Sequence, residues 1–212
     1  VAMRRRVVIT GMGVITPLGH SVADTFAAVC AGRSGVDRIT HFDARHFPTT
    51  FAAEVKNFDL GRYLKDAGRY DHCGSNTKFA LAASRQALED ANLLDRRPGV
   101  DPTRFGVYIG SGEGSEDFPA VMCGAAAGVE ETGTKVDPTR FIRTALSLLD
   151  GPREAELEMH TTTGHMADEF DLCGPNLACL TACAAGGQAI GEALELIRHN
   201  DADLMLAGGS HS

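Results

Sequence analysis

Positive charge is scarce in this sequence of 212 residues. Aspartate and glutamate outnumber lysine and arginine by 28 to 20, which gives a formal net charge of -8. The one basic cluster, Arg4–Arg6, is short. Because nucleic acids and anionic membranes bind clustered lysine and arginine, the sequence disfavours both as partners.

A long apolar run is also missing. The stretch after the basic cluster, Val7–Ile9, is too brief for a membrane span or for the core of a secretion signal. We therefore expect a cytoplasmic protein. Its hydrophobic content of 43% is enough to bury a substantial core. No internal repeat, low-complexity tract or linker interrupts the chain, so one domain over residues 1–212 is the simplest division.

The six cysteines include no Cys-x-x-Cys pair. If Cys179 and Cys183 share a strand, their sulfurs lie about 13 Å apart, too far to bind one ion. His160 and His165 are five residues apart, which fits neither one helical face nor one strand face. We therefore expect no metal site. Without a secretion signal, a disulfide scaffold is not expected either.

Strand-like and helix-like segments alternate along the chain, which predicts an α/β layered fold. The best-supported helix begins at Ser75, because alanines and one phenylalanine recur every four residues along it. Residues 116–158 have a weaker pattern and are expected to form a surface excursion. Strands are predicted at 6–10, 51–55, 105–110, 176–182 and 203–207, and helices at 21–30, 75–92, 138–149 and 185–198.

One cysteine stands at a position that favours reactivity. Cys183 falls between a predicted strand and a predicted helix whose first turn, 184–187, contains only alanine and glycine. A thiol at a helix N-terminus is stabilised as the thiolate by the helix dipole and by unpaired amides. Small neighbours leave room for a substrate carbonyl, and the Cys183 amide could stabilise its oxyanion. On these residues alone, an unreactive core thiol stays an alternative.

Longer blocks of sequence resemble the β-ketoacyl-acyl-carrier-protein synthases, the condensing enzymes of the thiolase superfamily. The resemblance is most specific at the two ends of the chain and weakest between about residues 117 and 160. The similar segments are Arg5–Gly19, Ala31–Gly35, His41–Asp43, Gly110–Gly112, Thr181–Gly186, Ala189–Ala193 and Asp201–Gly209.

The resemblance implies an α/β fold of thiolase-like layers, of which this chain is the N-terminal half, and a homodimer. It implies that Cys183 accepts an acyl group from the phosphopantetheine arm of an acyl carrier protein. Malonyl carrier protein would then lose carbon dioxide and extend the chain by two carbons. No other cofactor is expected. The catalytic histidines would come from the absent C-terminal half, because no histidine here matches them.

The same resemblance implies an acyl pocket that includes Gly112, Glu113 and Ala182. Glu113 is unusual, because family members with long acyl chains often carry an apolar residue there. A carboxylate in a pocket needs a hydrogen-bond partner, water or a polar substrate. The run of three threonines within 160–165 also favours a wetter pocket. Together these residues favour a specialised or polyketide-type acyl chain over an ordinary saturated one.

Three alternatives remain. A chain-length-factor-like partner subunit would share the fold, although such subunits typically lack the cysteine. A thiolase-type acyl-coenzyme-A transferase fits the two ends of the sequence less well. A dinucleotide-binding module could use the glycines of 110–114, but the third glycine of its motif would fall at Ser115 and no acidic residue follows in the expected place.

Overall fold

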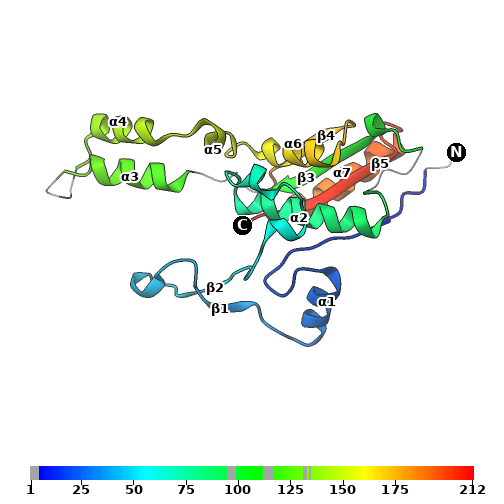
Figure 1. Ribbon diagram of the computed structural model, residues 1–212, viewed down its shortest axis with the longest axis horizontal. Helices are drawn as coiled ribbons and strands as arrows, with labels where there is room; N and C mark the ends of the chain where they lie inside the picture. The colour runs from blue at the N-terminus through cyan, green and yellow to red at the C-terminus, as the bar shows by residue number, and fades with distance from the viewer. Residues whose placement is uncertain (1–4, 95–98, 112–116, 131–132, 134) are drawn as a thin grey trace.

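The computed structural model describes residues 5–94, 99–111, 117–130, 133 and 135–212 (Figure 1). Its helices are α1 (Val22–Cys30), α2 (Ser75–Asp90), α3 (Phe118–Gly128), α4 (Pro138–Leu148), α5 (Gly151–Ala155), α6 (Met159–Phe170) and α7 (Ala185–Arg198). Its strands are β1 (Val36–Arg38), β2 (Phe51–Ala53), β3 (Phe105–Ser111), β4 (Asn176–Cys179) and β5 (Leu204–Ser210). Short 3-10 turns are η1 (Ala44–His46), η2 (Leu60–Arg62), η3 (Ala67–Tyr70), η4 (Pro102–Arg104) and η5 (Ala182–Ala184).

A parallel sheet in the order β4-β3-β5 forms the centre of the molecule. β3 is buried along nearly its whole length, as expected for the central strand of a sheet that is covered on both faces. In the register of this sheet, Gly110 of β3 lies beside Cys179 of β4 and Gly209 of β5. The carboxyl ends of all three strands therefore meet at one edge.

Alternate side chains of β3 face two different helical layers. Phe105, Val107 and Ile109 join the main core with residues of α2 and α6, whereas Tyr108 packs against the small residues of α7. Because side chains alternate along a strand, α2 and α6 cover one face of the sheet and α7 covers the other. Figure 1 shows this layering, with β3 and β5 between the helices.

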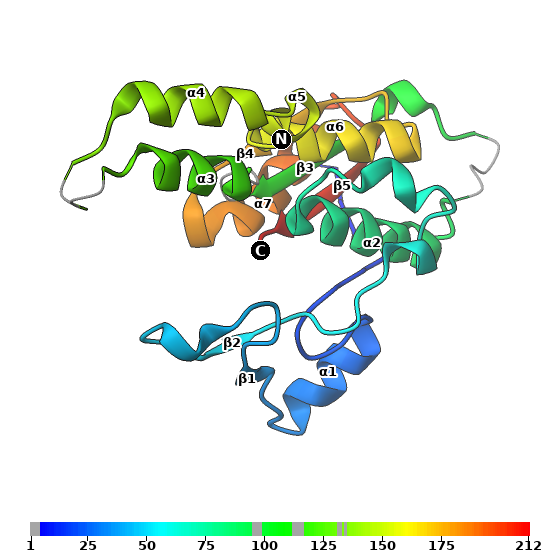
Figure 2. The ribbon, with the colours of Figure 1, turned by 60° about the vertical axis from the view of Figure 1, so that its left-hand side comes forward.

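Two further parts project from the layered body. α1 and the antiparallel pair β1-β2 form a smaller lobe to one side of the sheet (Figure 2). α3 and α4 lie along each other and extend from the end near α5 (Figure 1). Gly124 lies at their contact, where an added Cβ would be 3.2 Å from the Ala145 Cβ and 3.3 Å from the Phe141 carbonyl oxygen. No helix in the described residues is both long and apolar enough to cross a bilayer.

The strand predicted at residues 6–10 is not formed. These residues are part of no ladder, and Val8 and Ile9 are 64% and 78% exposed. The hydrophobic pattern of a strand is present, but in the structure no neighbouring strand edge pairs with it. The prediction of a first strand is therefore wrong for this structure.

Residues 11–14, which follow, are held against α2 instead. The Met12 amide donates to Asp90 Oδ2 at 3.0 Å, and the Gln86 side chain bonds the backbone of Val14. At Gly13, an added Cβ would lie 1.9 Å from the carbonyl oxygen of Ala83. Only glycine allows the chain to cross the helix this closely.

The other predicted elements differ from the structure mainly at their ends. β4 stops at Cys179 rather than continuing to residue 182, because the chain turns there. β5 continues through Gly208–Gly209 to Ser210, although two glycines normally weaken a strand. The helix predicted at 185–198 has those bounds in the structure.

Candidate active site

Cys183 lies at the carboxyl edge of the parallel sheet. It is the middle residue of η5, which connects the end of β4 to the start of α7. The cysteine is exposed. In open α/β folds, ligands bind at this edge of the sheet, so the chain turn presents the thiol where a substrate would reach it.

The residue before the cysteine has an unusual backbone conformation. Ala182 has φ of +50°, in the left-handed region. A residue with a Cβ is destabilised there by about 1–2 kcal/mol. Strained backbone of this kind is concentrated at functional turns, where surrounding structure enforces it. The turn resembles the nucleophile elbow of other α/β enzymes, because it places a nucleophile between a strand and a helix.

The N-terminus of α7 is open toward the cysteine. Its N-cap residue, Ala184, provides no side-chain hydrogen bond to the first-turn amides. The turn itself begins with Ala185, Gly186 and Gly187, of which Ala185 is buried, Gly186 is partly buried and Gly187 is exposed. Uncapped amides and the positive end of the helix dipole stabilise negative charge. This arrangement can therefore stabilise a thiolate or the oxyanion that forms when a thiolate attacks a carbonyl.

Glycine in two strands allows α7 to approach the sheet at this point. A Cβ at Gly110 would lie 2.2 Å from the carbonyl carbon of Ala185 and 2.5 Å from the amide nitrogen of Gly186. A Cβ at Gly209 would lie 3.0 Å from the Cα of Gly186. The contacts are backbone against backbone, so the position of the first turn of α7, and with it Cys183, is fixed by these glycines.

Exposure alone does not distinguish Cys183, because Cys30, Cys123 and Cys173 are exposed as well. Cys73 and Cys179 are buried. Burial, with the nearby Glu156 carboxylate, raises the pKa of Cys73 to about 12, so it remains a thiol at neutral pH. What distinguishes Cys183 is its place on the turn before α7.

Of the remaining predicted site residues, the structure describes Ala182 but not Gly112 or Glu113. Gly112 and Glu113 lie outside the described residues, so their place relative to the cysteine stays a prediction. Ala182 is next to Cys183 in the turn. Cys179 and Cys183 do not share a site, since the buried Cys179 Sγ faces the carbonyl oxygen of Ala185 at 3.4 Å.

Sequence reasoning missed a second group of polar side chains, in which His165 takes part. His165 Nε2 lies 2.7 Å from Glu156 Oε1, whereas His160 is exposed and does not join them. Burial disfavours ionisation of Glu156, but hydrogen bonds from His165 and Cys73 outweigh it and lower the pKa of the carboxyl. The group combines residues that are far apart in sequence, so no local spacing pattern could have revealed it.

A family model described as the β-ketoacyl synthase N-terminal domain matches residues 4–212. The chain belongs to the β-ketoacyl synthase family. It is 40% identical over 207 residues to 3-oxoacyl-[acyl-carrier-protein] synthase 2 of Coxiella burnetii, an alignment that covers 98% of this chain and 46% of that protein. The chain thus spans about half the length of the curated relatives it matches.

Solved β-ketoacyl synthase structures share the fold. The ishigamide ketosynthase/chain length factor superposes with a TM-score of 0.74 at 31% identity, covering 98% of this chain and 47% of that one. A type II polyketide ketosynthase, solved in complex with its acyl carrier protein, gives 0.70 at 26% identity, covering 99% and 46%. The predicted α/β, thiolase-like fold is confirmed. Membership of this family also removes the dinucleotide-binding alternative.

Proposed function

We propose that the full-length protein containing this chain is a β-ketoacyl-acyl-carrier-protein synthase whose nucleophile is Cys183. The observation that carries the proposal is the exposed cysteine on a strained turn at the open N-terminus of α7. Family membership and the names of the relatives support the same reaction.

In the first step, the Cys183 thiolate attacks the thioester carbonyl of an acyl carrier protein. The amide of Cys183 and the uncapped first turn of α7 stabilise the oxyanion of the tetrahedral intermediate. When this intermediate collapses, the carbon–sulfur bond to phosphopantetheine breaks and the carrier thiolate leaves and takes up a proton. The acyl group remains as a thioester on Cys183.

In the second step, malonyl carrier protein loses carbon dioxide, and the electron pair of the broken bond becomes a carbanion. The carbanion attacks the acyl carbonyl on Cys183, and the cysteine thiolate leaves. The product is a β-ketoacyl carrier protein that is two carbons longer. The only group that must be bound is the phosphopantetheine of the carrier, which is substrate.

Decarboxylation needs electrophilic groups at the malonyl carbonyl, and we assign them to histidines from the rest of the protein. His165 is the histidine nearest to Cys183 on the N-terminal side of the sequence. It contacts Glu156 and Cys73 instead, in a separate cluster. These contacts make His165 unsuited to a catalytic role at Cys183.

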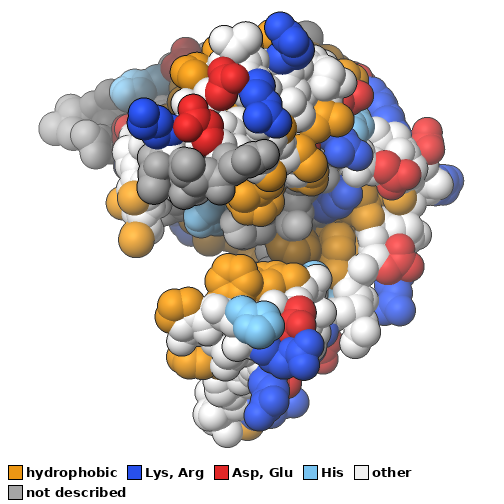
Figure 3. Space-filling model, turned by 90° about the vertical axis from the view of Figure 1, so that its left-hand side faces the viewer, with side chains coloured by type: hydrophobic (Ala, Val, Ile, Leu, Met, Phe, Trp, Pro, Cys, Tyr) orange, Lys and Arg blue, Asp and Glu red, His pale blue; other side chains and the backbone are white. Residues whose placement is uncertain are grey.

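The surface of the chain supports a requirement for a second half. A groove of about 760 Å³ separates β5 from residues 7–14, and it is lined mainly by apolar side chains from α1, α7 and β5. Hydrophobic side chains occupy both sides of the cleft between the smaller lobe and the body (Figure 3). Among the described residues, β5 pairs with β3 alone, so its other edge has free backbone groups. We propose that an extended segment beyond residue 212 fills this groove.

The partners follow from the reaction. We propose an acyl carrier protein as the donor, in line with the neighbour that was solved with its carrier protein. We also propose a homodimer of the complete protein, in the cytoplasm. No nucleic acid or membrane is expected to bind, given the net charge of -8.

The acyl pocket is proposed to include Gly112, Glu113 and Ala182. Ala182 has the clearest support, because it precedes Cys183 in the turn and is exposed with it. Glu113 would favour an acyl chain with a polar group, since a carboxylate beside a purely apolar chain would lack a partner.

Carbon dioxide release from malonyl carrier protein, together with transfer from an acyl carrier protein, tests the function in the full-length protein. We expect Cys183→Ala to abolish formation of the β-ketoacyl product. Cys123→Ala, which alters another exposed cysteine, is the matched control and should retain the wild-type rate. Condensation at the wild-type rate in Cys183→Ala would overturn the proposal.

A further inference from the structure

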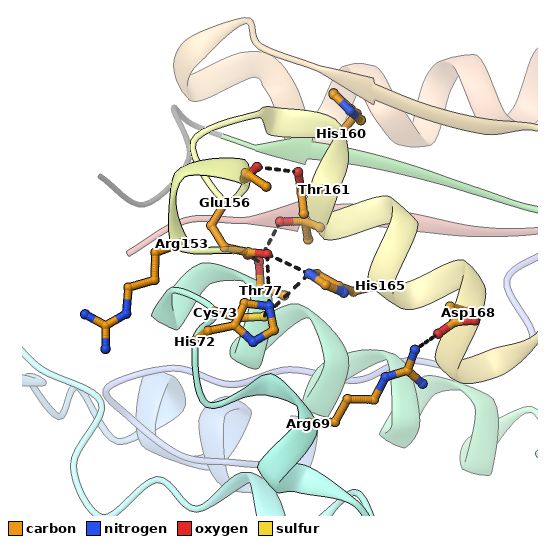
Figure 4. Close-up of polar contacts among 12 residues, drawn as sticks. Arg69, His72, Cys73, Thr77, Arg153, Glu156, His160, Thr161, His165 and Asp168 are labelled. Carbon is orange, nitrogen blue, oxygen red and sulfur yellow. Dashed lines mark hydrogen bonds and ion pairs between the residues drawn. The ribbon is translucent and has the colours of Figure 1, made fainter. Parts of the chain in front are cut away.

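Four side chains that can bind metals converge where the loop before α2 meets α5 and α6. His72 and Cys73 belong to that loop, Glu156 is the C-cap residue of α5, and His165 lies on α6. Their ligand atoms all lie within 4.8 Å of one another. Figure 4 shows the four side chains turned toward a common point, whereas His160, on the same helix as His165, lies apart.

Three of the six separations between these atoms match the edges of a small tetrahedron, and all six are within 4.8 Å. Cys73 Sγ lies 3.5 Å from His165 Nε2 and 3.7 Å from His72 Nε2, and His72 Nε2 lies 3.8 Å from Glu156 Oε1. Tetrahedral zinc with bonds of about 2.0–2.3 Å has ligand–ligand edges of about 3.3–3.8 Å. The 2.7 Å hydrogen bond between His165 and Glu156 is shorter. It would open by about 0.6 Å to admit an ion.

The surroundings also suit a divalent cation. Cys73 and Glu156 are 5% and 4% exposed, so their negative charges would be buried. With neutral histidines, one thiolate, one carboxylate and one divalent cation have a net charge of zero, which removes the cost of burying the anions. Thr77 Oγ1 donates to Glu156 Oε2 at 3.4 Å, which leaves Oε1 directed at the cluster. The His72 side chain, 34% exposed, lies where an ion could enter.

We propose that His72, Cys73, Glu156 and His165 form a structural zinc site. Sulfur and imidazole ligands favour zinc over magnesium or calcium, which prefer oxygen. Four protein ligands complete a tetrahedral shell, so the site has no open position for catalysis. On binding, the Cys73 thiol loses its proton to solvent as the sulfur–zinc bond forms. The proton between His165 Nε2 and Glu156 Oε1 leaves that position, to Nδ1 of the ring or to solvent, and His72, Glu156 and His165 then bind through lone pairs. The site is separate from Cys183 and does not depend on the proposed function.

The ion would connect three segments that are distant in sequence. Cys73 and His165 are 92 residues apart, and α5 and α6 follow the α3-α4 pair that projects from the body. Closing a long loop lowers the entropy of the unfolded chain more than closing a short one. A zinc ion that closes this loop would therefore stabilise the fold. Because its ligands lie on α6, after α5 and before α2, it would also fix the base of the α3-α4 projection against α2 and α6, which cover one face of the sheet.

Elemental analysis of the full-length protein tests the site directly. After purification, exposure to zinc alone and dialysis, we expect one zinc per chain in the wild type and a loss of at least tenfold in retained zinc in Cys73→Ser and His165→Gln. The matched controls are Cys30→Ser and His160→Gln, which alter an exposed cysteine and an exposed histidine of the same helix. Both controls should retain one zinc per chain.

Cobalt provides a readout that needs no variant to fold. Wild-type protein loaded with Co²⁺ should show intense visible bands of four-coordinate cobalt and a near-ultraviolet thiolate-to-metal charge-transfer band. Removal of zinc with a chelator should lower the melting temperature, and Zn²⁺ but not Mg²⁺ should restore it.

Two results would overturn the proposal. One is wild-type protein that retains no stoichiometric zinc after loading and shows no thiolate–cobalt band, in which case the four side chains form only a hydrogen-bond network. The other is zinc that stays at one per chain in both folded Cys73→Ser and folded His165→Gln, since the ion would then lie elsewhere. Neither result bears on Cys183, so failure of the zinc site is distinguishable from failure of the proposed condensing function.

Discussion

Replacing Gly110 by alanine should disable the active site although the residue has no reactive group. Gly110 is near the end of β3, and its missing side chain is the space in which the first turn of α7 sits. A Cβ there would lie 2.2 Å from the carbonyl carbon of Ala185, 2.4 Å from its oxygen and 2.5 Å from the Gly186 nitrogen. All three are backbone atoms, so no side-chain rotation can relieve the overlap.

The magnitude follows from that overlap. Ordinary contacts of a Cβ begin near 3.4 Å, so the helix start must move by about 1 Å. Overpacking of a tight interior costs about 1–3 kcal/mol and occasionally more, and we expect the upper part of this range because both sides are backbone. Alanine restricts the unfolded chain, which offsets about 0.4–1 kcal/mol. A net loss of about 2 kcal/mol in the free energy of unfolding is expected.

The effect on reactivity should exceed the effect on stability. Cys183 precedes α7 by one turn residue, so it moves with the helix start. A misplacement of about 1 Å at a reacting group can lower a rate about 100-fold. The assay is the rate of acyl transfer from an acyl carrier protein to Cys183 of the full-length protein, at a temperature where circular dichroism shows it folded.

Two other glycines provide graded controls. Gly209→Ala places a Cβ at 3.0 Å from the Gly186 Cα, a milder contact, so its rate should fall between those of Gly110→Ala and the wild type. Gly164 lies in α6, and no atom is within 4 Å of a Cβ added there. The Gly164→Ala protein should therefore transfer the acyl group at the wild-type rate and gain about 0.5–1 kcal/mol in the free energy of unfolding. Wild-type acyl transfer in Gly110→Ala would refute the role assigned to this packing.

Four further predictions concern single groups and the chain as a whole. Brief treatment with a thiol reagent, followed by peptide mapping, should label Cys183 first and leave Cys73 unlabelled; the reverse order would contradict the assignment. Glu113→Ile should favour longer apolar acyl donors in a transfer assay, and an unchanged profile would mean that the residue faces solvent. Glu54→Gln should lower the melting temperature at neutral pH. Hydrogen bonds from the backbone and hydroxyl of Thr40 and the backbone of His41 lower the pKa of Glu54, so its stabilisation is present above the ordinary carboxyl pKa and is lost as the pH falls through the lowered value. The Glu54→Gln deficit should therefore shrink in acid, and a pH-independent deficit would contradict this origin. Residues 1–212 alone should release no carbon dioxide from malonyl carrier protein and should aggregate, whereas co-expression with the rest of the protein should restore solubility and turnover; robust release by the chain alone would place the decarboxylating group within it.

Local signals in the sequence predicted those elements that depend on local interactions. The helix at 185–198 was predicted with its bounds, because small and apolar residues follow a helical period there. Ser21 was predicted to cap a helix, and its hydroxyl accepts from the Asp24 amide in the structure. The long match to a known family predicted the fold class.

Features that depend on distant partners could not be predicted in the same way. Residues 6–10 have a strand pattern, yet a strand needs a neighbouring edge, which the sequence of the segment does not specify. The close packing of Gly110 against α7 and the left-handed turn at Ala182 arise from tertiary contacts. The cluster of His72, Glu156 and their neighbours was missed because ligand spacing was sought only between residues close in sequence.

The assignment of Cys183 as the acyl acceptor is tested most directly by locating the acyl group. Full-length protein would be incubated with an acyl carrier protein thioester in the absence of malonyl carrier protein, so that the acyl-enzyme accumulates, and then digested and analysed by mass spectrometry. We predict one acyl group per chain, on the peptide that contains Cys183, and none in Cys183→Ala. An acyl group on any other residue of the wild type, or undiminished acylation of Cys183→Ala, would contradict the account.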